Sequence, residues 1–416
     1  MSRPSQIVSS VDVPKPQLRA LYARGAVVQL SNGREYLDLM NGKGCITLGH
    51  HHPSVTEAMI TRLREKVGCL TCWSDSFEIL AAMIVADSGI SGAQVAFFST
   101  GTEACRAAVE CSRRYSGKSL IASAGYHGWG DFWAPSSVFL EPNKNGVVDF
   151  YFVPELLEEV LDRYRGQIAM VMVSPDYVHL RPETLKRLVK LSKESEVLYC
   201  SDDVKNGYRY VAGSALPITT GEHADLYTFS KGLSNGQRLS CLVGTPEVMR
   251  TAKHMTYTSY FDSLPIAAAL ATLNHMSSER GYERLTACGS TLSARLRRLI
   301  EQSSVPIKVV GDGPLVQMIG ATETLDEAFY SACADHGLLL YDYDNQAVSL
   351  ATEDVLSAVT DRFKLVFEDL AESCGPLNGT EVSTQRQMEA AFSMIDGATD
   401  AVPAGEAIRW LREHKN

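Results

Sequence analysis

The sequence has no long apolar run, no excess of positive charge and no signal peptide, and each absence excludes a class of protein. No run approaches the ~18 consecutive apolar residues of a membrane-spanning helix. The 39 Lys and Arg residues are outnumbered by 49 Asp and Glu residues, and the formal net charge is −10 without any basic block. This balance argues against a nucleic-acid partner. Because Met1–Gln6 lacks the apolar centre of a signal peptide, we predict a cytoplasmic protein with no membrane partner.

Metal-binding patterns are missing as well. The ten cysteines are scattered, and Cys69 and Cys72 form a single C-x-x-C motif. A zinc site would need a second pair, or histidines at ligand spacing. His50, His51 and His52 are consecutive, so their side chains diverge in an extended chain and indicate a turn. We therefore predict reduced thiols and no metal site.

With 416 residues, the chain is long enough for two or three domains with an ample core. Residues 26–39 form two apolar runs around Asn32-Gly33, the pattern of a β-hairpin. Further on, apolar runs alternate with helical patterns, which predicts an α/β fold whose mostly parallel sheet is covered on both faces. The predicted strands are 94–98, a strand within 118–133 that ends at Tyr126, 168–174, 197–203, 225–230 and 239–244, and the predicted helices include 99–115 and 182–195.

A smaller α+β unit is expected after this sheet. Helices at 264–277 and 281–303 lead into it. Its predicted strands lie near 306–310, 315–320 and 337–341, and its predicted helix spans 353–371. The last forty residues contain Gly375, Pro376 and Gly379, followed by the patterns of two short amphipathic helices.

Several chemically distinctive residues fall where the predicted strands end: Ser99, Tyr126, Asp202 and Lys231. Ligands on parallel sheets bind beyond the carboxyl ends of the strands, so we expect these residues to lie together. A nearby carboxylate normally keeps a lysine charged. An aldehyde cofactor takes up the amine as an imine, while the carboxylate pairs with a protonated ring nitrogen, and this division of labour is found in pyridoxal phosphate sites.

The first of these strands runs into Ser99-Thr-Gly-Thr-Glu-Ala104 and then into a helix. Free backbone N–H groups, hydroxyls and the positive helix end converge at such a turn, which makes it an anion site. The same residues are also the pattern of ordinary N-capping by Ser99 or Thr100. Tyr126, which lies between glycines, also has two interpretations. Its ring either contacts a flat ligand or simply packs within a loop.

Taken in order, these segments resemble the class III (fold type I) pyridoxal-phosphate-dependent aminotransferases, nearest to the branch of glutamate-1-semialdehyde aminomutase. The resemblance covers roughly residues 20–370. It rests on the hairpin with Leu48-Gly-His-His-His-Pro53, Ser99-Thr-Gly-Thr-Glu-Ala104, Tyr126-His-Gly128, Asp202-Asp-Val204 and Ser230-Lys-Gly232. It implies a large domain over 61–280 with a mostly parallel seven-stranded sheet, a small domain over 281–416, and an N-terminal segment, 1–60, packing with the small domain.

The resemblance also implies pyridoxal 5′-phosphate as cofactor. Lys231 would form the Schiff base and move the proton, and Asp202 would pair with the ring nitrogen. Tyr126 and Val204 would contact the two faces of the ring. Asp203 stands where the family has Glu, and would hold a polar network on the ring side. The phosphate would be held by Thr100, Gly101 and Thr102.

In the family, a threonine from the partner subunit also binds the phosphate, within Gly-Thr-x-Ser-Gly-Asn-Pro. Only the proline of that stretch is retained here, at the end of Tyr257–Pro265. One of three neighbouring residues is expected to take over the contact: Thr258, Ser259 or Tyr260. The resemblance therefore implies a homodimer with shared active sites.

The expected substrate-side residues differ from those of the aminomutase. Lys43 replaces a tryptophan, and Trp73 lies in another segment expected to face a small-molecule amine or aldehyde substrate. The segment with Asp342 and Asp344 holds acids and tyrosines but no arginine, whereas a carboxylate substrate usually needs a bidentate Arg. This composition favours a polyhydroxylated or cationic amine, although it is equally typical of a surface loop. A lysine such as Lys43 is more often a solvated side chain, but its place beside Gly42 and Gly44 makes it a substrate-side candidate.

Several functions follow from these observations. The first is an aminotransferase for an amino sugar or aminocyclitol, resembling the 6′-position enzymes of neomycin- and gentamicin-type antibiotic pathways. Epimerisation at an amine-bearing carbon would use the same Lys231. Glutamate-1-semialdehyde aminomutase itself is disfavoured by Lys43 and by the altered Tyr257–Pro265 stretch. A non-catalytic binding protein on the same fold is disfavoured by the intact Lys231 and Asp202.

Overall fold

The computed structural model describes residues 19–66, 70–134, 136–374, 382–383, 386–387 and 404–414. Cys69 of the C-x-x-C motif lies outside these residues. The chain divides into two compact units, one formed by Ser54–Tyr282 and Gln387–Asn416 and the other by Met1–Pro53 and Glu283–Arg386. None of the helices in the described ranges is long and apolar enough to span a membrane.

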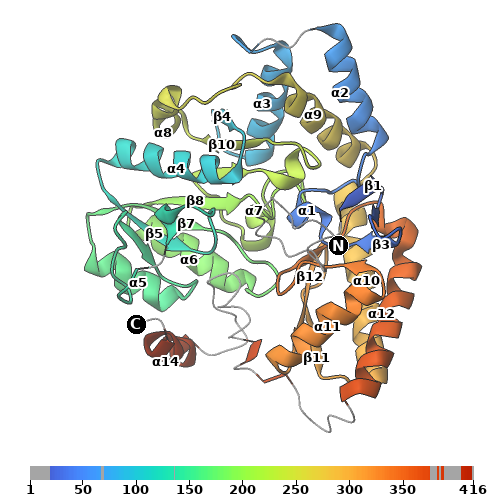
Figure 1. Ribbon diagram of the computed structural model, residues 1–416. Coiled ribbons are helices and arrows are strands. Elements are labelled where there is room, and N and C mark those ends of the chain that lie inside the picture. The colour runs from blue at the N-terminus through green and yellow to red at the C-terminus, as the bar shows by residue number, and fades with distance from the viewer. Residues whose placement is uncertain are drawn as a thin grey trace, which may run out of the picture. The chain divides into compact units, whose positions relative to one another are not determined.

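The larger unit is built on a seven-stranded sheet with the order β4-β10-β9-β8-β7-β5-β6 (Figure 1). Strand β10 runs antiparallel to both its neighbours, and the pairs from β9 to β6 are all parallel. The predicted mostly parallel seven-stranded sheet is thus confirmed. The strands are β4 (Gln94–Phe98), β5 (Leu120–Ala124), β6 (Val147–Asp149), β7 (Ile168–Val173), β8 (Leu198–Asp203), β9 (Leu226–Phe229) and β10 (Ser240–Gly244).

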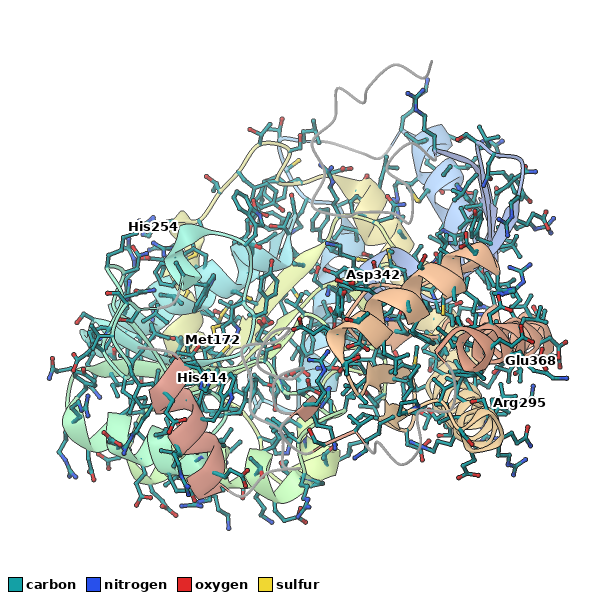
Figure 2. All side chains as sticks on the ribbon, turned by 60° about the horizontal axis from the view of Figure 1, so that its bottom comes forward. Met172, His254, Arg295, Asp342, Glu368 and His414 are labelled. Atoms are coloured by element: carbon teal, nitrogen blue, oxygen red, sulfur yellow. The ribbon has the colours of Figure 1, made fainter. Side chains whose placement is uncertain are left out.

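Both faces of this sheet are buried, as strand β7 shows. Met170 and Met172 pack in the cluster that includes the small residues of α4 (Gly101–Ser116), and Figure 2 labels Met172. Val171 and Val173 pack on the other face, in the cluster that includes residues of α5 (Pro154–Arg163) and α6 (Pro182–Glu194). Side chains alternate along a strand, so each face receives its own apolar set. Each buried Val or Met contributes about 1.5–3 kcal/mol.

Two further helices complete the second face, α3 (Asp75–Ser88) and α9 (Ser263–Ser278), whose residues belong to the same core cluster. The remaining elements of this part of the chain are short apart from α2. They are α2 (Pro53–Glu65), η1 (Asp131–Trp133), α7 (Leu216–Thr220), η2 (Lys231–Leu233), α8 (Pro246–Met249) and η3 (Arg250–His254).

Helix α14 (Ala404–His414) belongs to the larger unit. Its Ala407 and Leu411 are buried in the core of that unit, and Arg412 lies 3.7 Å from Glu159 of α5. The expected small domain, 281–416, therefore differs from the observed division at its C-terminal end. The amphipathic pattern of α14 requires an apolar surface, but no pattern in the sequence states which unit supplies it.

The described residues of the smaller unit form two sheets. One has the order β1-β2-β3-β13, in which β13 pairs parallel to β3, and the other is the antiparallel β11-β12-β14. The predicted hairpin is present between β2 and β3, with Gly33 at φ +79° in its turn. The strands are β1 (Ala20–Arg24), β2 (Val27–Leu30), β3 (Glu35–Asp38), β11 (Ile307–Val310), β12 (Leu315–Gly320), β13 (Leu338–Leu339) and β14 (Gln346–Ala347).

Helices flank these strands along the chain. They are α10 (Gly281–Ser303), α11 (Glu323–Asp335) and α12 (Thr352–Cys374), and the short segment α1 (Asn41–Gly44) is a left-handed turn. Helix α11 was not predicted from the sequence. Its start is nevertheless marked in the sequence, because the hydroxyl of Thr322 caps the helix by accepting a hydrogen bond from the N–H of Leu325.

Candidate active site

The predicted aspartate and lysine lie at the same edge of the large sheet. Strands β8 and β9 are parallel, with Asp202 opposite Thr228 and Asp203 opposite Phe229. Lys231 follows two residues after the end of β9, in the left-handed region at φ +38°. The structure thus brings Asp202 and Lys231 to the carboxyl ends of neighbouring strands, where ligands of such sheets bind.

Three groups donate hydrogen bonds to the buried carboxylate of Asp202. Oδ2 lies 2.7 Å from Nδ1 of His127, and Oδ1 accepts from the hydroxyl of Thr228 at 2.8 Å and from the N–H of Val204 at 3.2 Å. Burial raises the pKa of Asp202, but the hydrogen bond and charge of His127, with the other two donors, outweigh it and hold the pKa below the ordinary value. Asp202 is therefore a buried anion.

His127 and Thr228 were not assigned roles from the sequence. His127 is 2 % exposed, whereas its neighbour Tyr126 is 60 % exposed. The two side chains therefore point in opposite directions, that of His127 into the protein and that of Tyr126 towards solvent. The signal for His127 was present, because it stands inside Tyr126-His-Gly128. Thr228 could have been found from strand pairing, because it lies directly across from Asp202.

Asp203 lies on the other face of the sheet. Its Oδ2 accepts hydrogen bonds from the hydroxyls of Ser201 at 2.6 Å and Ser214 at 2.8 Å. Burial raises the pKa of Asp203 to about 7, against the lowering effect of these two bonds. The expected role in the ring-side network does not match this position. Adjacent residues of a strand face opposite ways, so Asp203 cannot join Asp202 there.

The turn before α4 is a capping box. The hydroxyl of Thr100 accepts from the N–H of Glu103, and the Glu103 carboxylate accepts from the N–H groups of Ser99 at 3.0 Å and Thr100 at 2.8 Å. The Thr100 hydroxyl also lies 3.1 Å from that carboxylate. Thr100 is thus engaged within the turn. The N–H groups of Gly101 and Thr102 lie in the first turn of α4, where backbone N–H groups have no acceptor within the helix. The structure is therefore compatible with both interpretations of this turn, helix capping and anion binding.

Close packing joins this turn to two other segments. A Cβ on Gly101 would lie 2.7 Å from Cγ1 of Val204, and a Cβ on Gly128 would lie 2.5 Å from Oγ1 of Thr102. Gly128 also adopts φ +126°, which other residues rarely do. The predicted phosphate-binding turn, the Tyr126 segment and Val204 therefore meet in one place.

Cys105 lies beneath this site, with Sγ 3.7 Å from Oγ1 of Thr228. Ligand atoms of Cys105, His127 and Asp202 lie within 4.8 Å of one another, a spacing that suits a metal ion. A metal would require the thiolate form. Burial, with the charge of Asp202, raises the pKa of the Cys105 thiol well above its ordinary value, so we assign these residues to the site around Asp202.

The segment expected to bind phosphate lies between η3 and α9. Thr258 and Ser259 are exposed, and Ser259 adopts φ +61°. Tyr260 is half-buried, with its ring 5.1 Å from that of Tyr257 and 4.8 Å from that of Phe261. Trp73 is 57 % exposed and its ring centre lies 5.5 Å from that of Phe261.

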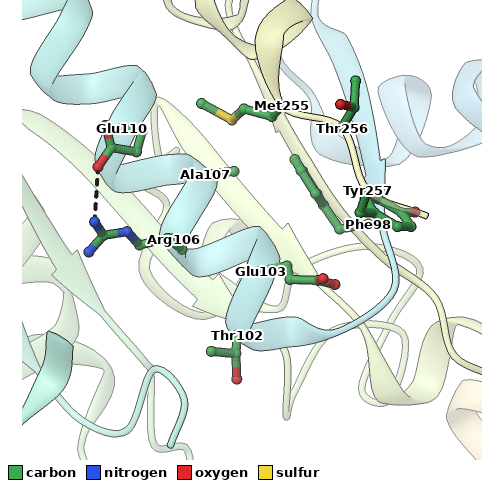
Figure 3. Close-up of a pocket in the computed structure, with 9 residues that line it drawn as sticks. All are labelled: Phe98, Thr102, Glu103, Arg106, Ala107, Glu110, Met255, Thr256 and Tyr257. Carbon is green, nitrogen blue, oxygen red and sulfur yellow. Dashed lines mark ion pairs between the residues drawn. The ribbon is translucent and has the colours of Figure 1, made fainter. Parts of the chain in front are cut away.

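A groove of about 330 Å³ runs between α4 and the chain from Met255 to Tyr257 (Figure 3). Arg106 and Glu110 form an ion pair of 3.2 Å along its helical side. Neither Asp202 nor Lys231 lines it. Its lining residues are Phe98, Thr102, Glu103, Arg106, Ala107, Glu110, Met255, Thr256 and Tyr257.

The remaining predicted substrate residues belong to the smaller unit. Lys43 stands in a turn whose residues from Asn41 to Gly44 all have positive φ, and its Nζ lies 4.8 Å from the centre of the Tyr341 ring. Asp342, labelled in Figure 2, is exposed. Oδ1 of Asp344 accepts a hydrogen bond from the N–H of Asn345 at 2.6 Å. The structure thus brings Lys43 next to the acidic segment.

These residues fit pyridoxal phosphate by their chemistry. The carboxylate of Asp202 is a buried anion that can accept about four hydrogen bonds. Three are already made, to His127, Val204 and Thr228, so one acceptor site remains for a protonated ring nitrogen. The first N–H groups of α4, at Gly101 and Thr102, suit a phosphate. Lys231 would supply the amine for the aldehyde, and the exposed ring of Tyr126 would contact the cofactor ring.

Comparison with known proteins agrees with this arrangement. The sequence model described as Aminotransferase class-III matches residues 8–362, and the chain belongs to this family of pyridoxal-phosphate enzymes. The 2′-deamino-2′-hydroxyneamine transaminase of Streptomyces kanamyceticus is 27% identical over 345 residues, with 82% of this chain and 88% of the relative covered. A glutamate-1-semialdehyde 2,1-aminomutase of Thermus thermophilus is 30% identical over 353 residues, with 76% and 81% covered.

Solved structures show the same fold. The FumI protein of Sphingopyxis sp. MTA144 superposes with a TM-score of 0.77 at 22% identity, covering 87% of this chain and 91% of its own. The ornithine aminotransferase of Toxoplasma gondii has a TM-score of 0.77 at 22% identity, covering 88% and 93%. The protein is therefore an aminotransferase of fold type I with pyridoxal 5′-phosphate as cofactor, as predicted.

Proposed function

We propose that this enzyme transfers an amino group to or from a ring-bearing amino sugar or aminocyclitol. The observation that carries the proposal is the segment from Tyr341 to Asn345, which offers the exposed Asp342 and two tyrosines but no arginine. A carboxylate substrate would usually be held by a bidentate arginine. The transaminase of Streptomyces kanamyceticus, named for an aminoglycoside compound, supports the same substrate class.

A small set of residues would carry out the amino transfer together with the cofactor. Pyridoxal phosphate supplies, when bound, an aldehyde that captures the amine and a ring that withdraws electrons from the neighbouring carbon. Asp202 would hold the proton on the ring nitrogen, and His127 keeps Asp202 ionised and oriented. Lys231 Nζ would accept the proton from the substrate carbon that bears the amine and would donate it back during the transfer. The N–H groups of Gly101 and Thr102 would hold the phosphate, and Tyr126 and Val204 would contact the two faces of the ring.

We also propose that the active enzyme is a homodimer. Thr258 and Ser259 are exposed hydroxyl residues on a segment held by aromatic contacts. Placed against a second subunit, one of them, or Tyr260, would complete the phosphate site there. Light scattering of the purified enzyme measures the mass directly, and a monomer with full activity would contradict the proposal.

An aminomutase or amino-acid substrate is the second candidate. The 30% identity to the Thermus aminomutase favours it. Epimerisation at an amine-bearing carbon would use the same Lys231, with the proton returned to the opposite side. It differs from transfer because it needs no second substrate and leaves the amine on the same carbon.

A spectral half-reaction tests the substrate class. The yellow holoenzyme is mixed with glutamate, and separately with neamine, an aminoglycoside with primary amines, and the visible cofactor band is followed. Loss of the band with neamine supports the aminosugar function. Loss with glutamate alone overturns it in favour of the amino-acid candidate. Lys231→Ala should abolish both reactions while phosphate contacts still retain the cofactor.

Charge reversal tests the acidic segment itself. Asp342→Lys combined with Asp344→Lys should reduce kcat/KM for neamine far more than for glutamate, because a cationic substrate would meet like charge. Asp361→Lys is the matched control, since Asp361 is an exposed residue of α12 in the same unit. Equal losses for both substrates would remove the segment from substrate recognition.

A further inference from the structure

Three rings pack one on the next, starting at Asp202. We call His127, Trp133 and Phe132 the aromatic stack. The ring centre of Trp133 lies 4.7 Å from that of His127, and Phe132 meets Trp133 edge-on, also at 4.7 Å. Ring centres at such distances are in favourable contact. Because Nδ1 of His127 lies 2.7 Å from Oδ2 of Asp202, the stack begins at the carboxylate that faces the cofactor nitrogen.

The two nitrogens of His127 have different surroundings. Nδ1 is engaged with Asp202, whereas Nε2 is buried and has no hydrogen-bond partner among the described residues. A half-turn of the imidazole about its Cβ–Cγ bond would put a carbon where Nδ1 now lies, and Asp202 would lose this donor. The torsion of that bond has only a weak intrinsic preference. Since Nε2 receives no help from a hydrogen bond, packing has to fix the orientation of the ring.

Trp133 supplies this packing. Its ring is half-buried and is tilted by 53° against the imidazole. With the two ring centres 4.7 Å apart, the imidazole cannot turn about its Cβ–Cγ bond without displacing the larger ring, because protein interiors leave little free space. Trp133 also helps to keep solvent from His127, which is 2 % exposed.

Trp133 is itself held firmly. The side-chain amide of Asn143 donates to the carbonyl of Phe132 at 3.0 Å and to that of Ala134 at 2.6 Å. The buried Phe132 ring is covered by the guanidinium of Arg106, 3.9 Å from the ring centre, and Figure 3 shows Arg106 on α4. The backbone on both sides of Trp133 is therefore fixed by one side chain, and the imidazole packs against an ordered ring.

The orientation of His127 matters because of how the donors to Asp202 are divided. The hydroxyl of Thr228 and the N–H of Val204 both donate to Oδ1, whereas His127 donates to Oδ2. Loss of the His127 bond would make the carboxylate more basic. The proton shared between Asp202 and the cofactor nitrogen would then lie closer to the carboxylate.

We propose that Trp133 is a positioning residue for the amino-transfer reaction. It holds His127 in the orientation in which Nδ1 donates to Asp202, so that Asp202 leaves the proton on the cofactor nitrogen. The inference concerns the chemistry common to the family and applies to any amine substrate. It is therefore independent of the proposed substrate class, and each can fail without the other.

The state of the cofactor nitrogen tests the proposal without a substrate. Nitrogen NMR of the holoenzyme, loaded with pyridoxal phosphate isotopically labelled at the ring nitrogen, reports whether that nitrogen carries the proton. Trp133→Leu keeps apolar volume but removes the flat ring, and should move the signal towards the unprotonated position by as much as His127→Ala does. Trp133→Phe retains a ring and should stay near wild type. Trp410→Leu is the matched control, because the Trp410 ring stacks on that of His414 at 4.5 Å on α14, and it should match wild type.

A double variant separates positioning from a general structural effect. If Trp133 acts through His127, Trp133→Leu combined with His127→Ala should give the same signal as His127→Ala alone. Trp133→Met, whose flexible side chain fills the space without a flat face, should behave like Trp133→Leu and replaces it if the leucine variant does not retain the cofactor. A wild-type signal in these variants, or a double variant displaced beyond His127→Ala, would overturn the inference.

Discussion

Nδ1 of His127 lies 2.7 Å from Oδ2 of Asp202, and both side chains are buried. The pairing explains how a carboxylate in the core of the sheet keeps its charge. Burial alone would favour the neutral acid, whereas the imidazole N–H supplies a hydrogen bond that only the anion accepts fully.

The first prediction concerns this pair. His127→Ala removes the strongest donor to Asp202, so the pKa of Asp202 should rise and the ring nitrogen should be held less firmly. Since a charge-assisted hydrogen bond is worth about 1.5–3 kcal/mol, kcat/KM should fall roughly 10- to 100-fold. Steady-state kinetics measures the loss. His254→Ala, at the exposed end of η3, is the control, and equal rates in both variants would contradict the assignment.

The contact between Gly101 and Val204 gives the second prediction. Gly101→Ala would place a Cβ 2.7 Å from Cγ1 of Val204, so the turn that carries the phosphate N–H groups must shift. We expect the Kd for pyridoxal phosphate to rise roughly tenfold, as overpacking costs about 1–3 kcal/mol. Adding Val204→Ala should recover part of the loss. Gly405→Ala, with no atom within 4 Å of its added Cβ, should bind normally, and strictly additive losses would argue against the clash.

The third prediction is a pH dependence of stability. The pKa of Asp203 is raised to about 7 by burial, whereas an unfolded aspartate titrates near ~3.9. The folded state therefore holds the proton more tightly. The resulting stabilisation is complete below the unfolded pKa, and is lost as the pH rises through about 7.

Asp203→Asn should remove this dependence, because the amide stays neutral. Urea unfolding at pH 5 and pH 8 measures it. The free energy of unfolding of the variant relative to wild type should increase between these two values by about 3 kcal/mol. Asp361→Asn, on an exposed position, should show no such change. A constant difference between Asp203→Asn and wild type would mean that Asp203 is ionised throughout.

The fourth prediction concerns a buried ion pair in the smaller unit. Nη2 of Arg386 contacts Oδ2 of Asp326, and Oδ1 of Asp326 accepts from the N–H of Gly320 at 2.6 Å. Arg386→Ala leaves a buried carboxylate without its cation, which typically costs about 3–5 kcal/mol. The urea midpoint should fall accordingly, and adding Asp326→Asn should restore part of it. Arg298→Ala, exposed on α10, should leave the midpoint unchanged.

The sequence predicts what depends on local pattern and order along the chain. The strands that end at Asp202 and near Lys231 are runs of buried residues, and their succession requires parallel pairing. The hairpin turn at Gly33 is local in the same sense. The turn before α4 carries its own capping signal at Thr100 and Glu103. These elements were predicted because the residues that determine them are neighbours.

What the sequence did not predict depends on contacts between distant residues. The side of the sheet on which Asp203 lies follows from strand parity once Asp202 is placed. Its Ser214 partner, however, lies eleven residues further along the chain. The rings of Trp73 and Phe261 are in contact although the two residues lie almost two hundred positions apart in the sequence, and no periodicity marks such a pair. The docking of α14 on the larger unit is of the same kind.

The place of α14 also bears on how the enzyme is made. Its Ala407 and Leu411 complete a core whose other buried residues end at Leu273, so the larger unit lacks part of its interior until the smaller unit has been translated. During synthesis, this core would stay incomplete while the more than one hundred residues between Leu273 and α14 are translated. Expressing Ser54–Tyr282 alone would omit the same helix, so dissection of this enzyme should keep residues 404–414, joined or supplied as a separate peptide.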